Sequence, residues 1–469
     1  MNQSLTLPMA DKFYHDKQTS AFIRSVNVSW EKPEKDHYYL EYSYNQKDWY
    51  ALNGGFPIVL PCDELSVTDA LKTQDPNGET ISVAALSSLQ NKYGKPEPVC
   101  IQSVERCESD PETVQVTYTN GMKEIRNIIR SEDGIGHIQD NDYAAPIISH
   151  RADPYIYKHT DGKYYFLGSH TDAGHNLNGT YQYLYIILRC ADTLEDLTDN
   201  SGRYTEKVIY EREPIGPDRV SPHLWAPEIH YIQGGWYVYY TTTVSDHSSW
   251  RIRPHCLACT GDDPMNDPWI TKGPIQTTVE NDIAFTDFSL DHTFFHHKGE
   301  DYFVWAQKTN NISDIFIAKL SNPWTICTPS VLLTHPEYNW ELHGFAVNEG
   351  PAVIKHGGRI FLTFSASGTD ALYNMGLLYA DEDSDLLDSS SWTKLPYPVF
   401  QSSRATGFFG PGHNSFTTDE DGNDIMVYHA RTYDGIKTKD PLYDPNRHAH
   451  LLKVQYDENG RPIFDYQKH

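Results

Sequence analysis

Short runs of alternating apolar and polar residues, separated by turn residues, recur along the last two thirds of the chain. One of them, "ADPYIYKHTDGKYYFLGS", spans residues 152–169 and turns at Asp161-Gly162 between two aromatic-rich runs. Two runs of strand residues on either side of a glycine turn are typical of a β-hairpin. No run approaches the ~20 apolar residues that a membrane-spanning helix needs, so we expect no membrane partner.

The same layout occurs four more times along the chain. Each copy begins with a polar residue in a small or Pro/Gly-rich setting, continues into a strand, turns at glycine and continues into an aromatic-rich strand. The other copies are "APEIHYIQGGWYVYYTTT", "LDHTFFHHKGEDYFVWAQ", "NEGPAVIKHGGRIFLTFSAS" and "GHNSFTTDEDGNDIMVYHA". The segments between the copies leave room for two further strands in each. Five repeats of four strands predict an all-β chain that folds as a five-bladed β-propeller.

The closing of the ring and the position of the polar residues follow from this prediction. The last strand candidate, "HAHLLKVQY", would return to complete a blade and protect its edges. In a propeller the first strand of every blade lines the central channel, and these strands all start at one mouth. We therefore expect the five leading polar residues to converge on one pocket, whereas residues that only cap turns would not converge. These residues are Asp153, Glu228, Asp291, Glu349 and His413.

The charge of the chain excludes some partners and permits others. Lys and Arg total 38 and Asp and Glu total 64, for a formal charge of -26. Such a chain repels nucleic acid and anionic lipid but not a neutral sugar. The first residues, "MNQSLTLPMADKFYHDKQ", lack the charged-then-apolar layout of a secretory signal, which predicts a cytoplasmic location. The seven scattered cysteines do not indicate a disulfide framework.

Converging carboxylates suit the hydrolysis of glycosides. That reaction needs one carboxyl group that is protonated and a second that is ionised, and their surroundings must separate their pKa values. Five motifs carry a more specific resemblance: "ADPYIY", "LWAPEIHY", "FSLDHTFF", "VNEGPAVI" and "GPGHNSF". Their order and spacing resemble glycoside hydrolase family 43, and within it the exo-acting α-1,5-L-arabinofuranosidases. "YDPNRHAH" and "TFSASGTDALYNMGLLYAD" add to the likeness, which covers residues 145–469.

The resemblance implies a fold, an activity and three catalytic roles. The family is a five-bladed propeller that works by inversion of configuration. Asp153 is similar to its general base, Glu349 to its general acid and Asp291 to the carboxylate that adjusts the pKa of the acid. The implied activity is release of terminal arabinofuranose from neutral α-1,5-linked arabino-oligosaccharides. A β-xylosidase or an endo-arabinanase of the same family is the alternative, and a sugar-binding propeller without catalysis is a third reading.

Three further residues are implied to bind substrate or metal. His413 is similar to the family's axial histidine, which in several members contacts a calcium ion largely through waters; the alternative is a hydrogen-bonded histidine in the channel. Arg447 resembles an arginine that reaches both the sugar and the base. Trp225 would either stack on a sugar or pack in the core. Calcium prefers oxygen ligands, so one histidine indicates a weak or indirect site.

The resemblance does not extend to residues 1–144. Their strand-like alternation, with a hairpin at Asn120-Gly121, predicts an N-terminal β-rich accessory region that resembles an immunoglobulin-like module. The polar, turn-rich stretch 131–146 marks the join to a catalytic domain that spans 145–469. The accessory region would bind carbohydrate, form an oligomer contact or shape the pocket, and we favour the last role. The sequence does not predict an oligomeric state.

Overall fold

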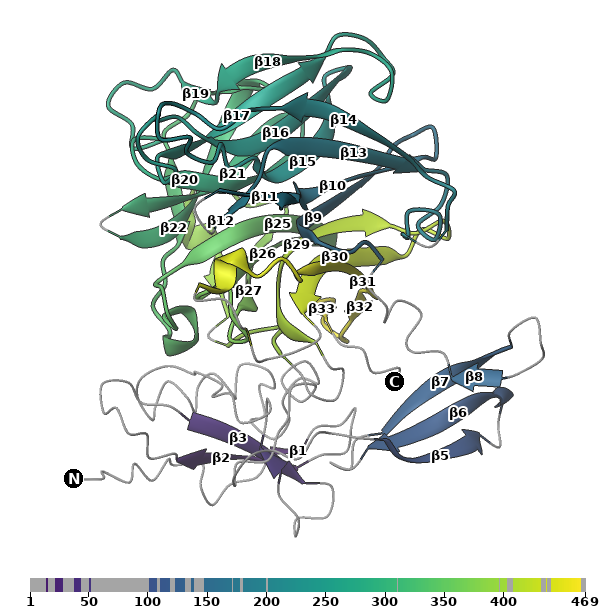
Figure 1. Cartoon of the computed structure of the whole chain (residues 1–469). Coiled ribbons are helices and arrows are strands. Elements are labelled where there is room, and N and C mark those ends of the chain that lie inside the picture. The colour runs from purple at the N-terminus through teal and green to yellow at the C-terminus, as the bar shows by residue number, and fades with distance from the viewer. Residues whose placement is uncertain are drawn as a thin grey trace.

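The computed structural model describes residues 147–464 except 171, 178–179, 200, 310, 396, 403–407, 432–435 and 437–439, together with eight strands among the first 146 residues (Figure 1). In the described part of residues 147–464 the regular secondary structure is almost entirely β-strand. The helical elements described there are three short 3-10 turns, η2 (Asn339–Glu341), η3 (Ser389–Ser391) and η4 (Pro441–Tyr443). Within the described part of the chain, no helix has the length and hydropathy needed to span a membrane.

Five sheets follow one another along the chain, antiparallel except for the pair β19–β23, and each runs from an inner strand to an outer one. The first contains β9 (Arg151–Lys158), β10 (Tyr164–His170), β13 (Tyr185–Ala191) and β14 (Thr205–Glu211). The second contains β15 (Trp225–Ile232), β16 (Gly235–Thr243), β17 (Ile252–Cys259) and β18 (Trp269–Pro274). The third contains β20 (Ser289–His297), β21 (Glu300–Thr309), β22 (Ile312–Asn322) and β24 (Val331–Thr334), extended by β19 (Gln276–Thr277) and β23 (Thr325–Ile326). The fourth contains β25 (Asn348–His356), β26 (Arg359–Ala366), β27 (Asn374–Asp381) and β28 (Thr393–Lys394), and the fifth contains β29 (Phe409–Thr418), β30 (Asp424–Arg431) and β31 (His448–Lys453). Two small hairpins lie outside these sheets, β11 (Asp172–Leu177) with β12 (Thr180–Gln182) and β32 (Gln455–Tyr456) with β33 (Pro462–Ile463).

The inner strands form a closed ring. Each of β9, β15, β20, β25 and β29 contacts the inner strands of both neighbouring sheets, and β29 contacts β9. The sheets are therefore the five blades of a propeller, which confirms the predicted fold class. The ring closes where β31 pairs with the segment before β9: Ile147 N–H donates to the carbonyl of Ala449 at 2.8 Å, and Ala449 N–H donates to that of Ile148 at 2.9 Å.

The N-terminal strands form two separate antiparallel sheets of four strands each. One contains β1 (Tyr14–His15), β2 (Phe22–Asn27), β3 (Tyr38–Ser43) and β4 (Tyr50–Ala51), and the other contains β5 (Ile101–Cys107), β6 (Asp110–Tyr118), β7 (Lys123–Arg130) and β8 (Gly136–Ile138). Strands β6 and β7 form the hairpin predicted at Asn120-Gly121, with Thr117 opposite Lys123. The domain boundary at 144/145, the immunoglobulin-like character and the role of this region stay predictions.

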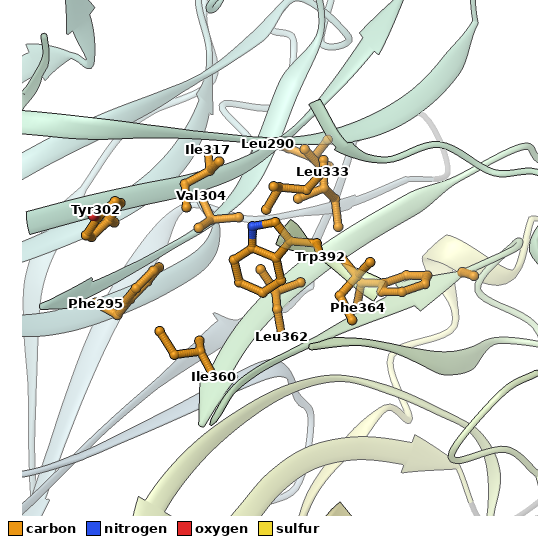
Figure 2. Packing of buried hydrophobic residues seen from close by; sticks show 14 of the residues in the cluster. Leu290, Phe295, Tyr302, Val304, Ile317, Leu333, Ile360, Leu362, Phe364 and Trp392 are labelled. Carbon is orange, nitrogen blue, oxygen red and sulfur yellow. The ribbon is translucent and has the colours of Figure 1, made fainter. Parts of the chain in front are cut away.

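Apolar side chains fill the spaces between neighbouring blades. Between the third and fourth blades, Val304 and Ile317 face Leu362 and Phe364, and Figure 2 shows the indole of Trp392 among the side chains of this cluster. Because a propeller strand is covered on both faces, β26 is buried at seven consecutive positions rather than at alternate ones. This packing holds adjacent blades together beneath the pocket.

We expect Leu362→Ala to lower the free energy of unfolding by about 2–5 kcal/mol, because it empties part of a close-packed interface between blades. Leu362 is fully buried, whereas Leu332 in β24 is 42% exposed and serves as the matched control. Urea denaturation of both variants measures the difference. Equal losses from Leu362→Ala and Leu332→Ala would contradict the importance of this interface.

Candidate active site

A residue with left-handed backbone geometry interrupts the inner strand of every blade. The φ angles are +53° at Asp153, +45° at Ala226, +43° at Asp291, +54° at Gly350 and +41° at His413. In each blade this residue lies where the pairing of the inner strand with its neighbour shifts register, as in a β-bulge. The five positions are therefore structurally equivalent. Left-handed geometry at a non-glycine residue costs free energy, and such strain gathers at functional sites.

These equivalent positions differ from the register predicted by the sequence at two blades. Ala226 takes the position in the second blade, so Glu228 lies two residues beyond it. Gly350 takes the position in the fourth blade, where a β-carbon would come within 3.0 Å of the His413 ring, and Glu349 lies one residue before it. The expectation that Glu228 reaches the common pocket is wrong. Its Oε2 instead pairs with His230 Nε2 at 2.9 Å in the buried channel.

The other four predicted residues meet in one pocket of about 280 Å³. Asp153, Asp291, Glu349 and His413 line it, together with Arg447. An apolar wall faces this polar group and includes Trp225, Trp250, Phe288, Leu290, Phe345 and Leu442. The site thus combines a cluster of carboxylates with aromatic surfaces on which a sugar ring can stack.

Asp153 lies in a network of donors and positive charge. Ser169 Oγ donates to its Oδ2 at 2.6 Å, while His413 Nδ1 lies 3.3 Å and Arg447 Nη1 3.6 Å from its Oδ1. Burial by itself would raise the pKa of Asp153, but the interactions with His413, His429 and Arg447 outweigh it and hold that pKa well below the usual range. Burial also lowers the pKa of both histidines, so the permanent charge beside Asp153 is the guanidinium of Arg447.

Glu349 and Asp291 show the opposite behaviour. Burial raises the pKa of Glu349 to about 7, and the charge of Asp153 adds to this effect against a hydrogen bond from Tyr373. Burial, followed by the charges of Glu349 and Asp153, raises the pKa of Asp291 well above its usual range, although the Gly350 N–H donates to it. Near neutral pH the site therefore holds an ionised Asp153 beside carboxyl groups that retain protons.

The structure places each predicted substrate contact at the pocket. Arg447, between η4 and β31, is buried and faces Asp153. His413 Nδ1 also lies 3.5 Å from Asp291 Oδ2. Trp225 lines the pocket, but His223 stacks on its indole with ring centroids 4.1 Å apart, so much of its surface packs against protein.

Several residues of the site were not singled out from the sequence. Tyr373 contacts Glu349, Ser169 and His429 contact Asp153, and Lys308 lies over the ring of Phe288 at the pocket wall. Tyr373 falls within one of the motifs that resemble the family, but no repeat marks it, because it lies between strands β26 and β27. Ser169 and His429 lie on second strands of their blades, where the repeat carries no distinctive polar position.

The residues around His413 do not fit a directly bound calcium ion. Within the described residues, no three His, Cys, Asp or Glu side chains form a group that could hold a metal. The Nδ1 atom of His413 is directed at two carboxylates, and calcium takes oxygen rather than nitrogen ligands. We therefore assign no step of a reaction to a metal, and an indirect calcium site stays a prediction.

We expect Arg447→Met to lower the free energy of unfolding by about 3–5 kcal/mol at pH 7, because it leaves a buried carboxylate without its counter-charge. Without the guanidinium, burial would raise the pKa of Asp153, so Asp153 in the variant takes up a proton as the pH falls, whereas in the parent it stays ionised. The loss caused by the substitution should therefore shrink toward pH 4–5. Urea denaturation at several pH values measures it.

The exposed Arg203, which pairs with Glu195 and Asp196, offers a matched control. Arg203→Met should change stability little at any of these pH values. A pH-independent loss in Arg447→Met would show that Arg447 acts by packing rather than by charge.

Proteins of known function show strong similarity to the second part of the chain. An "Extracellular exo-alpha-(1->5)-L-arabinofuranosidase" of Streptomyces avermitilis is 44% identical over 326 residues, which cover 69% of this chain and 63% of that protein. "Alpha-L-arabinofuranosidase 43" of Humicola insolens is 45% identical over 327 residues, with the same two coverages. The chain thus spans less than two thirds of the length of these relatives.

A solved structure agrees with the sequence comparison. The crystal structure of an α-L-arabinofuranosidase from Lactobacillus brevis is 44% identical and superposes with a TM-score of 0.61. The match covers 70% of this chain and 99% of that one. The propeller fold is therefore shared over nearly the whole of that enzyme.

The predicted cytoplasmic location is wrong. The exo-arabinofuranosidase of Streptomyces avermitilis is named as extracellular, and so is that of Streptomyces chartreusis, which is 42% identical over 298 residues. The prediction depended on the pattern of the first residues alone. A catalytic propeller carries no physical mark of its compartment, since the fold and the site are the same on either side of a membrane.

The family assignment depends on the whole second part of the chain. The family model described as "Glycosyl hydrolases family 43" matches residues 143–462, which include all five blades and every residue of the pocket. This chain belongs to glycosyl hydrolases family 43.

Proposed function

We propose that the protein is an exo-acting α-L-arabinofuranosidase that releases terminal arabinofuranose from short α-1,5-linked arabino-oligosaccharides. The observation that carries the proposal is the pocket in which an ionised Asp153 lies near the raised-pKa carboxyl group of Glu349. Glycoside hydrolysis requires this separation of protonation states. The names of the related enzymes support arabinofuranose as the sugar.

The roles of the two main carboxyl groups follow from their charge states. Asp153, held ionised by Arg447, takes a proton from water as the water oxygen bonds to the anomeric carbon. Glu349 gives its proton to the departing oxygen as the glycosidic bond breaks. Water attacks from the face opposite the leaving group, so the configuration inverts. Proton exchange with solvent then restores both residues.

Asp291 acts on the acid rather than on the sugar bond. Its carboxyl group is buried beside those of Glu349 and Asp153, and like groups at short range disfavour ionisation. Because the two groups interact, the protonation state of Asp291 adjusts the pKa of Glu349. His413 lies against both Asp153 and Asp291 and holds them in position.

The shape and lining of the pocket favour exo action. A volume of about 280 Å³ is at the low end for ligand pockets and suits one furanose ring with part of a second. Trp250 is 44% exposed and Phe345 59% exposed at the apolar wall, where they offer surfaces for the leaving sugar. An endo-arabinanase needs an open groove that admits chain on both sides of the cut.

The reaction is tested by the products from arabinotriose and by the anomer first formed. We expect arabinose and arabinobiose at first and arabinose alone at the end, with the inverted anomer seen by proton NMR. Nitrophenyl α-L-arabinofuranoside should be cleaved and the β-D-xyloside should not. Cleavage of the xyloside alone would make the protein a β-xylosidase, and internal cuts in longer arabinan would make it an endo-arabinanase.

We expect Asp153→Asn and Glu349→Gln each to lower kcat on arabinobiose by at least about a hundredfold, because each removes a proton acceptor or donor. Glu228→Gln is the matched control, a buried carboxyl group outside the pocket. Burial raises the pKa of Glu228 well above its usual range, so glutamine resembles its protonated form. An equal loss in the control would mean that substitution of any channel carboxyl group disturbs the fold.

The dependence of kcat/KM on pH should be one-sided. Asp153 stays ionised down to low pH, so activity should hold below pH 6, whereas Glu349 loses its proton near its pKa of about 7. Activity should therefore decline through about pH 7 and above. Initial rates between pH 4 and 9 measure this profile. A decline only on the acid side would reverse the assignment of acid and base.

A further inference from the structure

Tyr373 is buried beside the carboxyl group to which the proposed function gives the acid role. It lies in the loop between β26 and β27, and its hydroxyl donates to Glu349 Oε1 at 2.8 Å. The ring of His429 stacks parallel to its ring, with centroids 5.6 Å apart. On another side a β-carbon on Gly412 would come within 2.4 Å of Tyr373 Cε1, so only glycine leaves room for the ring. The tyrosine is thus held in one orientation.

The direction of the hydrogen bond to Glu349 depends on a backbone N–H at the start of the same series of hydrogen bonds. The N–H of His413 donates to Ser365 Oγ at 2.6 Å, and an amide N–H can only donate. Ser365 uses one acceptor site for this bond and also hydrogen-bonds the hydroxyl of Tyr373, toward which its own proton is free to point. Tyr373 then has its proton available for Glu349. Three donors follow one another in a single direction and end at Oε1.

This chain of donors distinguishes the two oxygens of Glu349. Oε1 already accepts a hydrogen bond from Tyr373, so a protonated Glu349 carries its own proton on Oε2. Without the tyrosine hydroxyl, the proton could occupy either oxygen. The acid would then be correctly protonated for only part of the time.

We propose that Tyr373, backed by Ser365 and the His413 amide, is a positioning residue that keeps the acid proton of Glu349 on Oε2. The proposal rests on the proposed function, because it assigns Glu349 the role of acid. It adds a residue from a loop of the fourth blade to the group that prepares the proton transfer. The leaving-group oxygen receives the proton from Oε2 when the glycosidic bond breaks.

Other groups also act on the charge of Glu349. Asp153 disfavours its ionisation from the first blade, and Lys308 and Arg447 favour it from β21 and the segment before β31. A hydrogen bond from a hydroxyl is stronger to a carboxylate than to a carboxylic acid. Removing the Tyr373 hydroxyl should therefore raise the pKa of Glu349 further above about 7.

The test is Tyr373→Phe, assayed on two substrates across pH. Arabinobiose has a poor leaving group that must be protonated, whereas nitrophenyl α-L-arabinofuranoside has a good one. We expect kcat on arabinobiose to fall by about tenfold to a hundredfold and on the nitrophenyl substrate by about threefold or less. The alkaline decline of kcat/KM should move to higher pH by about half a unit to one unit. Ser365→Ala should cause a smaller shift in the same direction.

Tyr239→Phe is the matched control. Tyr239 is a fully buried tyrosine in β16 whose hydroxyl donates to the carbonyl of Pro323, away from the pocket. Equal losses on both substrates with no movement of the alkaline decline, as a purely structural role predicts, would overturn the role of Tyr373. A parent protein that is folded but inactive on both substrates would instead overturn the proposed function.

Discussion

A strand that alternates regularly cannot turn two neighbouring side chains toward the same surface, and this constraint shapes the whole site. Each inner strand of the propeller breaks this alternation at one bulge, where one residue has left-handed backbone geometry. In the third blade Leu290 and Asp291 are adjacent in sequence, and both line the pocket. Such geometry costs of order 1–3 kcal/mol for a non-glycine residue. The packing between blades must supply that stability, which is why the closure at Ala449 and the buried cluster around Trp392, which reaches the pocket at Trp225 and Leu290, matter to the site.

The same bulges bring several carboxyl groups into a buried space where they cannot all be ionised. One permanent cation, Arg447, faces Asp153, and the pKa values of the carboxyl groups separate as a result. Hydrogen bonds also act on the individual carboxyl groups. Ser169 and His429 hold Asp153 from the first and fifth blades, and Tyr373 holds one oxygen of Glu349. An arrangement that would destabilise an ordinary core thus leaves one carboxyl group ionised and others protonated near neutral pH, as the proposed base and acid require.

Much of the site could be predicted because polar residues repeat at similar points of similar hairpins. Asp153, Asp291, Glu349 and His413 lie in the pocket, whereas Glu228 does not. In the second blade Ala226 takes the left-handed position, and Glu228 lies two residues further along the strand. A side-chain pattern shows where a strand starts but not which residue its bulge turns inward. Tyr373 could not be selected either, because it reaches Glu349 from a loop that belongs to no repeat.

The amino-acid sequence by itself determined the number of blades, the order of their strands and the chemical types gathered at their starts. These are local properties, since hairpins and turns depend on residues close together in the chain. Only the tertiary structure decided which polar residues meet, which carboxyl group keeps its proton and how the ring closes. Those outcomes depend on distance and burial among residues far apart in sequence, such as Arg447 beside Asp153 and Ile148 beside Ala449. The electrostatic energy of a carboxyl group depends on what surrounds it in space, and a linear pattern does not contain that information.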